Sequence, residues 1–158
     1  MSMLTDCDEI WHAGDIGGLP VLDRLIKTKK TIRAVYGNID DAKIRIAVPG
    51  ELEWVLDGKK FLMTHIGGYP GHYAKGIKDL LRKHQPDVFI CGHSHILKVI
   101  FDKELNLLHL NPGACGKEGF HQVRTMLKFS IQDGVLKDMA VVELGKRGSD
   151  HGAMTKEH

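Results

Sequence analysis

The sequence contains little of several residue types and patterns, and each shortage excludes a class of protein. Only 3 of the 158 residues are cysteine, and no two are spaced as C-x-x-C, which argues against a cysteine-ligated structural zinc site. No apolar run approaches the roughly 18 residues that span a bilayer. The formal net charge is only +2, without a run of like charges, so nothing indicates nucleic acid or a membrane surface as a partner.

The rest of the composition is that of a globular domain. Hydrophobic residues make up 42% of the chain and charged residues 27%. We expect one domain with a real core over residues 1–145, followed by a flexible tail over residues 146–158, which contain few large apolar groups. An odd number of cysteines without a signal peptide favours a reduced, cytoplasmic protein.

Strand and helix patterns alternate along the chain and predict an α/β fold. The spacing of apolar residues predicts helices over residues 19–30 and 71–85. For residues 44–50 we predict neither a helix nor a strand. Two packed sheets with helices outside would accommodate this order of elements. Short apolar runs and Asp-Gly turns predict strands or hairpins over residues 8–13, 31–36, 51–65, 86–91, 98–111 and 125–144.

Metal-capable side chains follow four of these apolar runs. They are Asp15, Asn38, His65, and the pair His93 and His95. Open α/β sheets commonly place ligand sites at the carboxyl ends of their strands. Residues two apart in an extended segment face the same way, so His93 and His95 are expected to reach two neighbouring metals. Nitrogen and oxygen donors without thiolate suit Mn²⁺, Fe, Zn²⁺ or Ni²⁺.

Each residue taken alone also has a structural explanation. Asp15 could cap the next helix, and Asn38 with Asp40 could form an ordinary Asx turn. His65 could be a packed core histidine. A His-x-His pair directly after a buried strand is harder to explain in this way, and the four segments together favour a metal centre.

The ordered motifs resemble those of the calcineurin-like metallophosphoesterases, and in particular the small bacterial and archaeal phosphodiesterases. The resemblance covers roughly residues 6 to 145 and implies a four-layer α-β-β-α sandwich of two mixed sheets with a dinuclear metal site. The matching segments are Gly14-Asp15, Gly37-Asn38-Ile39-Asp40, Thr64-His65, Gly92-His93-Ser94-His95 and Leu110-Asn111-Pro112-Gly113.

The resemblance also implies residue roles and a reaction. Asp15 would bridge two divalent transition metal ions; Asn38, His65 and His93 would complete one site, and His95 would belong to the other. Asp40 would orient the ligands without binding metal. Asp15, Asn38, Asp40 and His65 are thus the candidate catalytic residues, in a phosphodiesterase that uses a metal-bound hydroxide.

The chain departs from the family pattern in two places. The apolar strand ending in Asp-x-His, which supplies two further ligands, is missing. We therefore expect that the recorded chain is a truncated or misassigned start of a longer protein and that its second metal site is weak. In addition, Ile39 stands where many members carry the histidine that protonates the leaving group, which favours activated or aryl phosphodiesters.

Two classes of function remain open at this stage. The first is a metal-dependent phosphodiesterase acting on a small substrate. The second is a metal-depleted binding or scaffold protein of the same fold. The loop over residues 67–73 and the side chains of Arg45, Lys117 and Arg124 are further candidates for substrate contact. A homodimer or a higher homo-oligomer is compatible with either class.

Overall fold

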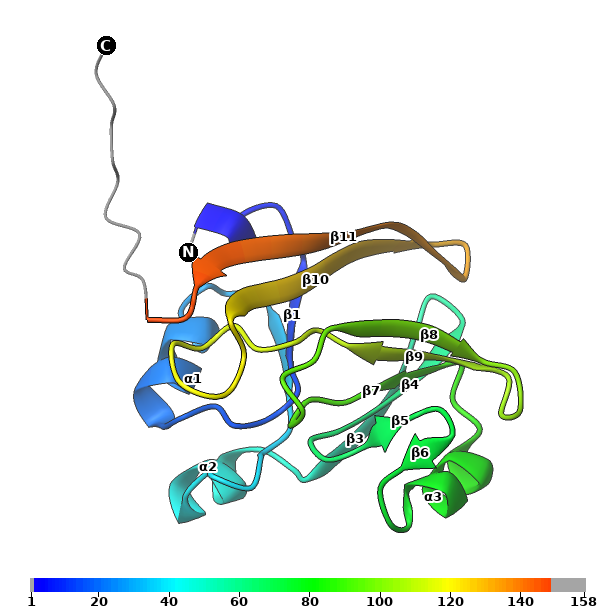
Figure 1. Cartoon of the computed structure of the whole chain (residues 1–158). Coiled ribbons are helices and arrows are strands. Elements are labelled where there is room, and N and C mark those ends of the chain that lie inside the picture. The colour runs from blue at the N-terminus through cyan, green and yellow to red at the C-terminus, as the bar shows by residue number, and fades with distance from the viewer. Residues whose placement is uncertain (1, 149–158) are drawn as a thin grey trace.

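The computed structural model describes residues 2–148 and confirms the mixed α/β class (Figure 1). Within these residues, no helix combines the length and apolar character needed to cross a bilayer. The elements in chain order are the 3-10 helix η1 (Ser2–Leu4), β1 (Glu9–His12), α1 (Leu19–Ile26), β2 (Thr31–Ala34), α2 (Ala42–Ala47), β3 (Glu51–Leu56), β4 (Lys59–Thr64), β5 (Gly68–Tyr69), β6 (His72–Tyr73), α3 (Ile77–His84), β7 (Val88–Ile90), β8 (Lys98–Asp102), β9 (Leu107–Asn111), β10 (Val123–Gln132) and β11 (Val135–Lys146).

The largest sheet is mixed and has five strands in the order β3-β4-β7-β9-β8. Strands β4, β7 and β9 run parallel, while β3 and β8 are antiparallel to their neighbours. Two-stranded sheets make up the rest: parallel β1–β2, antiparallel β10–β11 and the short β5–β6 pair. The parallel pairs bring the carboxyl ends of β1 with β2, and of β4 with β7, to common edges.

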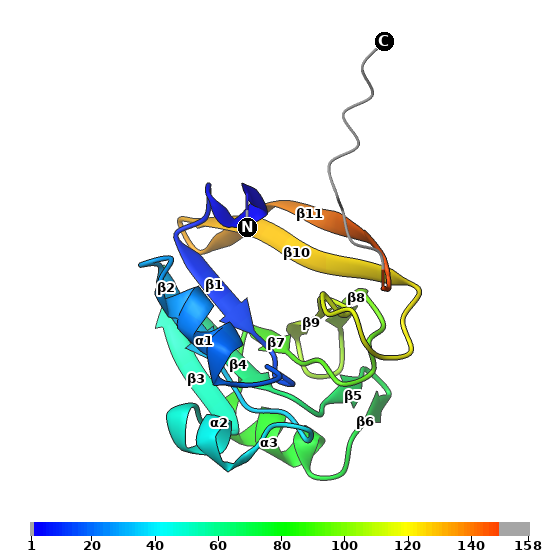
Figure 2. The ribbon, with the colours of Figure 1, turned by 90° about the vertical axis from the view of Figure 1, so that its left-hand side faces the viewer.

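Apolar side chains along these strands point alternately to the two faces of the five-stranded sheet, so both faces are covered by other elements. On one face, Leu62 and Phe89 pack against Leu81 of α3. On the other face, Phe61 belongs to a second cluster, whose Trp11 on β1 also contacts Phe129 on β10 at a ring separation of 5.4 Å. Helices α1 and α2 pack on β2 in a third cluster (Figure 2). The four-layer arrangement of two mixed sheets stays a prediction, because β1–β2 and β10–β11 are separate sheets.

Helix ends differ from the predicted ones for local reasons. The helix predicted from residue 71 begins only at Ile77, because His72–Tyr73 pair with β5 and Gly76 has a left-handed backbone (φ 82°). Helix α1 ends at Ile26. Helix α2 was not predicted, although Asp41 caps it by accepting a 3.0 Å hydrogen bond from the N–H of Ile44. Strand β11 extends to Lys146, and residues 149–158 of the expected tail lie outside the described residues.

Candidate metal centre

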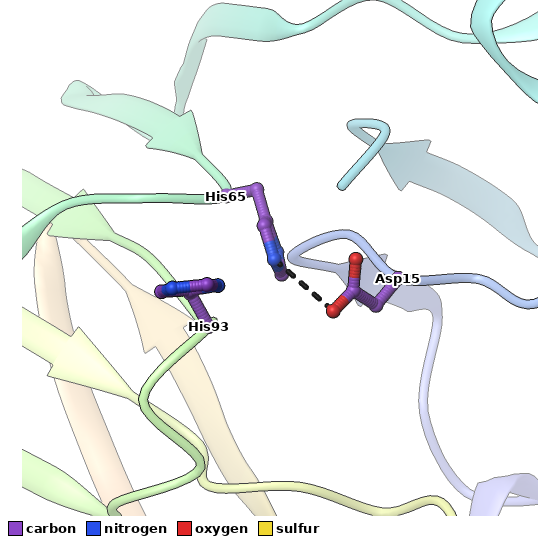
Figure 3. Close-up of side chains that lie close together, drawn as sticks. All are labelled: Asp15, His65 and His93. Atoms are coloured by element: carbon purple, nitrogen blue, oxygen red, sulfur yellow. Dashed lines mark ion pairs between the residues drawn. The ribbon is translucent and has the colours of Figure 1, made fainter. Parts of the chain in front are cut away.

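Four of the five predicted ligands meet beyond the carboxyl ends of two parallel strand pairs. Asp15 lies in the loop after β1 and Asn38 in the loop after β2. His65 directly follows β4, and His93 follows β7 after a turn. Ligand atoms of Asp15, His65 and His93 all lie within 4.8 Å of one another (Figure 3). The convergence predicted from the strand ends is therefore present, and we call Asp15, Asn38, His65 and His93 the four-donor cluster.

His65 shows why this cluster suits a cation. The side chain is only 6% exposed, and its Nδ1 donates a 2.7 Å hydrogen bond to the carbonyl oxygen of Ala13. A neutral imidazole has one N–H, so its Nε2 carries a lone pair. That Nε2 faces Oδ1 of Asn38 at 2.9 Å and Oδ2 of Asp15 at 3.2 Å. Three acceptor atoms thus point at one another, an arrangement that a metal ion between them would stabilise.

Asn38 links this arrangement to the second imidazole. Its Oδ1 also lies 3.0 Å from Nδ1 of His93, and the rings of His65 and His93 meet nearly edge to face, with centroids 5.3 Å apart. The other oxygen of Asp15, Oδ1, accepts a 3.2 Å hydrogen bond from the N–H of Ile39. The donors present fit a divalent transition metal, because they combine imidazole nitrogen with carboxylate and amide oxygen.

The two loops that carry the oxygen ligands pack unusually closely at Gly37. A Cβ at this position would lie 2.0 Å from Oδ1 of Asp15 and 2.3 Å from its backbone nitrogen. Any side chain at residue 37 would therefore push Asp15 away from Asn38. Only glycine permits the two oxygen donors to reach the same point.

Asp40 holds the same two loops together from the inside. Its carboxylate, 5% exposed, accepts hydrogen bonds from the N–H groups of Ile16 (3.0 Å), Gly17 (3.0 Å) and Gly37 (2.7 Å). Burial alone would raise the pKa of Asp40, but these three donors lower it below its usual value. Asp40 thus contacts the backbone that positions Asp15 and Asn38, consistent with the predicted orienting role.

A buried histidine on β1, not predicted as part of the site, lies behind the cluster. Nδ1 of His12 is buried and has no hydrogen-bond partner within residues 2–148. Burial lowers the pKa of His12, and the charge of Asp40 partly opposes this effect. The only sequence signal was its place at the end of the strand that leads to Asp15.

The backbone at three candidate ligands is left-handed. Asp15, His93 and His95 have φ values of 55°, 63° and 59°, a region that non-glycine residues seldom adopt. Such strain often accumulates at functional sites. It also corrects one prediction: His93 and His95 do not alternate along an extended strand, because β7 ends at Ile90 and both residues lie in the loop beyond it.

His95 lies apart from the four-donor cluster, beside a histidine that sequence reasoning missed. Its Nδ1 is 3.3 Å from Nδ1 of His121, and the two rings meet nearly edge to face at 5.2 Å. Burial lowers the pKa of His95, the neighbouring His121 lowers it further, and Asp15 acts in the opposite direction. His121 occurs in an irregular loop before β10, where no strand end drew attention to it. We call His95 and His121 the histidine pair.

Other candidates for substrate contact mainly hold the local structure. The Tyr73 hydroxyl donates a 2.6 Å hydrogen bond to Asp102, and the Lys98 ammonium lies 3.7 Å from the ring centroid of Tyr69. Arg45 donates to the carbonyl oxygens of Asp40, Gly37 and Asn38, although it still lines a depression of about 620 Å³ beside Asn38 and His65. The proposed substrate contact of Lys117 stays a prediction.

Several solved structures have the same fold as this chain. An archaeal phosphodiesterase has a TM-score of 0.71 at 21% identity, over 90% of this chain and 88% of its own. Vps29 from Chaetomium thermophilum has a TM-score of 0.70 at 13% identity, over 92% and 87%. Vps29 from Entamoeba histolytica, solved as a complex with zinc, has a TM-score of 0.68 at 17% identity, over 90% and 86%. At these identities the likeness shows the fold alone.

The family itself is shown by sequence. No curated protein matches the chain. A family model described as the calcineurin-like phosphoesterase superfamily domain matches residues 1–134, which is most of the sequence. The chain therefore belongs to the calcineurin-like phosphoesterase superfamily.

Proposed function

We propose that this protein is a metal-dependent phosphoesterase that hydrolyses small phosphodiesters. The observation that carries the proposal is that Nε2 of His65, whose Nδ1 faces the carbonyl oxygen of Ala13, lies 2.9 Å from Oδ1 of Asn38 and 3.2 Å from Oδ2 of Asp15. Family membership supports a phosphoesterase in general. Phosphodiester specificity and metal dependence are our own inferences.

The residues of the four-donor cluster would hold one divalent cation, with Mn²⁺, Zn²⁺, Ni²⁺ or Fe as candidates. His95 would serve a second, weaker site. Bound cations would supply positive charge for the phosphate oxygens and lower the pKa of a bound water. Asp40 keeps Asp15 and Asn38 at their mutual distance through its backbone hydrogen bonds. Ala13 fixes the orientation of His65 by accepting its N–H.

Ile39 favours a particular class of substrate. Its backbone N–H donates to Asp15, so this residue lies at the edge of the cluster, and its side chain is 67% exposed. An isoleucine cannot protonate a leaving group, and the loss of a general acid typically costs ~10²–10⁴ in rate. We therefore propose substrates whose leaving group is stable without a proton, such as aryl phosphodiesters. The net charge of +2 gives no reason to add nucleic acid or a membrane surface as a partner.

The test is hydrolysis of bis-p-nitrophenyl phosphate, compared with the monoester p-nitrophenyl phosphate, after chelation and readdition of Mn²⁺, Ni²⁺ or Zn²⁺. We expect metal-dependent activity, with the diester preferred. Asp15→Asn should reduce the rate at least ~100-fold. Asp133→Asn is the matched control, because Asp133 has nearly the same left-handed backbone (φ 53° against 55°) but lies in the exposed β10–β11 turn. Equal loss in both variants would contradict the proposal.

A second function is favoured by one comparison. Two of the structural neighbours described above carry the name Vps29, one of them was solved with zinc, and a further neighbour, from Cryptosporidium parvum, is named Vacuolar Protein Sorting 29. The same fold thus holds zinc in a protein that is named for sorting and not for hydrolysis. Stoichiometric metal binding by the four-donor cluster without hydrolysis of either ester would favour this binding or scaffold role over the phosphodiesterase.

A further inference from the structure

His121 contacts His95 in a way that the proposed function does not yet use. The side chain of His121 is only 7% exposed, and its Nδ1 lies 3.3 Å from Nδ1 of His95. Its other nitrogen, Nε2, lies 2.9 Å from the carbonyl oxygen of Gly116. Both nitrogens of a nearly buried imidazole are therefore engaged by the protein, which fixes the orientation of the ring.

The positions of the protons follow from these two contacts. A carbonyl oxygen can only accept, so Nε2 of His121 carries the hydrogen that it donates to Gly116. In a neutral ring, Nδ1 of His121 is then the acceptor. The hydrogen between the two Nδ1 atoms must come from His95. His95 consequently has its proton on Nδ1 and a lone pair on Nε2.

The loop that carries His121 is shaped to fit this pair. Gly119 has φ +125°, a backbone conformation that side chains rarely adopt. A Cβ there would lie 2.4 Å from Cε1 and 2.6 Å from Nδ1 of His95, and 3.2 Å from Nδ1 of His121. Glycine at residue 119 therefore lets the loop close onto His95, and a larger residue would separate the two rings.

We propose that His121 is a positioning residue that fixes the tautomer and the orientation of His95, leaving Nε2 of His95 free to bind a ligand at the candidate centre. Histidines that bind metals almost always donate their other N–H to a protein acceptor, and here His121 provides that acceptor. The ligand role of His95 rests on the proposed function. The tautomer does not, because it follows from contacts within the protein alone.

A competing arrangement makes a different prediction. Two nitrogens bound to one tetrahedral zinc at ~2.0–2.1 Å lie roughly 3.3 Å apart, which is also the separation of the two Nδ1 atoms. In that arrangement His121 would itself be a ligand, and neither Nδ1 would carry a proton once zinc is bound. The position of the His95 proton separates the two arrangements.

The first experiment is long-range ¹H–¹⁵N NMR of the histidine side chains at pH 8, in metal-free protein and after zinc addition. The signals are assigned with His95→Ala and His121→Ala. We expect the Nδ1–H tautomer for His95 and the Nε2–H tautomer for His121, with zinc shifting only Nε2 of His95. An Nε2–H tautomer for His95 in the metal-free wild type, or zinc shifting Nδ1 of both rings, overturns the proposal. This readout requires no catalysis, so it fails independently of the proposed function.

Variants provide a second, independent measurement. His121→Ala should convert His95 into a mixture of tautomers and weaken binding of the second equivalent of zinc by ~10–100-fold. His121→Gln should retain much of that affinity, because its side-chain oxygen can accept the proton of His95. Gly119→Ala should resemble His121→Ala, whereas Gly58→Ala should resemble the wild type, because Gly58 also has a positive φ (+76°) but its Cβ would meet nothing within 4 Å and it lies in the β3–β4 turn. Loss of affinity in Gly58→Ala equal to that in Gly119→Ala, or an unaltered His95 tautomer in His121→Ala, would contradict the positioning role.

Discussion

The four-donor cluster and the histidine pair lie at the same edge of the molecule but are built differently. In the cluster, side chains from four segments bring oxygen and nitrogen atoms that can bind metal within hydrogen-bond distance of one another, and Asp40 binds the backbone of two of the segments. In the histidine pair, two rings satisfy one another and a backbone carbonyl. The cluster offers a cation two oxygen and two imidazole ligands, whereas the two rings of the pair already contact each other. The cluster should therefore bind metal more tightly than the pair.

The comparison also shows that metal affinity depends on the number of ligand atoms as well as on how firmly each side chain is held. His65 is nearly buried and its Nδ1 is held by Ala13, so the side chain loses little conformational freedom when a cation binds. His95 is oriented in a comparable way by His121, yet it has no carboxylate or amide oxygen at hydrogen-bond distance among residues 2–148. A well-oriented imidazole without further donors predicts a weak site.

The sharpest way to break this comparison is to remove one histidine from each half of the His-x-His motif. His93→Ala should weaken the tightest metal binding roughly 100-fold or more, because it removes a donor of the cluster, while His95→Ala should change it less than about 10-fold. The two residues are well matched, since both have a left-handed backbone (φ 63° and 59°) that alanine strains equally. Calorimetric titration with Zn²⁺ or Mn²⁺ measures both effects, and the reverse order would refute the assignment.

A smaller effect is expected when Asp40 no longer holds the two oxygen-bearing loops. Asp40→Asn turns N–H donors toward the backbone N–H groups of Ile16, Gly17 and Gly37, so we expect ~10–100-fold weaker metal binding. We also expect about 1–3 kcal/mol lower free energy of unfolding. Because the pKa of Asp40 is lowered on folding, its stabilisation is present above its ordinary value of 3.8 and is lost as the pH falls below it.

The neighbouring residue provides the control for this variant. Asp41 caps α2 through a hydrogen bond from Ile44, and asparagine caps helices about as well as aspartate. Asp41→Asn should therefore leave both metal affinity and denaturation by urea unchanged. If the two variants behave alike, the backbone hydrogen bonds of Asp40 do not hold the cluster together.

The smallest predicted effect concerns a histidine that belongs to neither the four-donor cluster nor the histidine pair. It accounts for a loss of folding stability in acid that would otherwise be assigned to one of those two regions. His109 is fully buried on β9, and burial lowers its pKa to about 4 from the ordinary 6.5. The unfolded chain therefore binds a proton that the folded protein excludes, and stability falls as the pH decreases from about 6.5 towards 4. At pH 5.5 the loss should be roughly 1.4 kcal/mol.

Removing this group identifies its share. His109→Phe should flatten the dependence of unfolding free energy on pH over that window, whatever its effect at pH 8, while the exposed His72→Gln should not. A persistent slope in His109→Phe would place the acid sensitivity elsewhere, with the buried His12, whose pKa burial also lowers, as the next candidate.

Much of the fold could be predicted from sequence because its signals are local. The Asp57-Gly58 and Asp133-Gly134 turns both have positive φ at the aspartate and at the glycine, as the tightest hairpins require. The four oxygen and nitrogen donors of the cluster could be located because parallel strands end at a common edge. Neither inference needed knowledge of long-range packing.

The parts that could not be predicted depend on irregular backbone. His121 lies 26 residues after His95 in a loop without periodicity, so only the folded chain shows that the two rings meet. The left-handed conformation of His93 and His95 likewise breaks the alternation that a strand would impose. Helix α2, of six residues, is too short for its apolar spacing to be diagnostic.

The aromatic contact between β1 and the five-stranded sheet provides an intrinsic spectroscopic signal, so no added label is needed. Trp11 and Trp54 are the only tryptophans in the chain, and their rings meet edge to face with centroids 5.0 Å apart. Two indoles this close should couple electronically, giving a near-ultraviolet circular dichroism couplet and mutually altered fluorescence. Both signals would disappear as soon as β1 separates from the five-stranded sheet. Circular dichroism and fluorescence would therefore report when this contact is lost during unfolding.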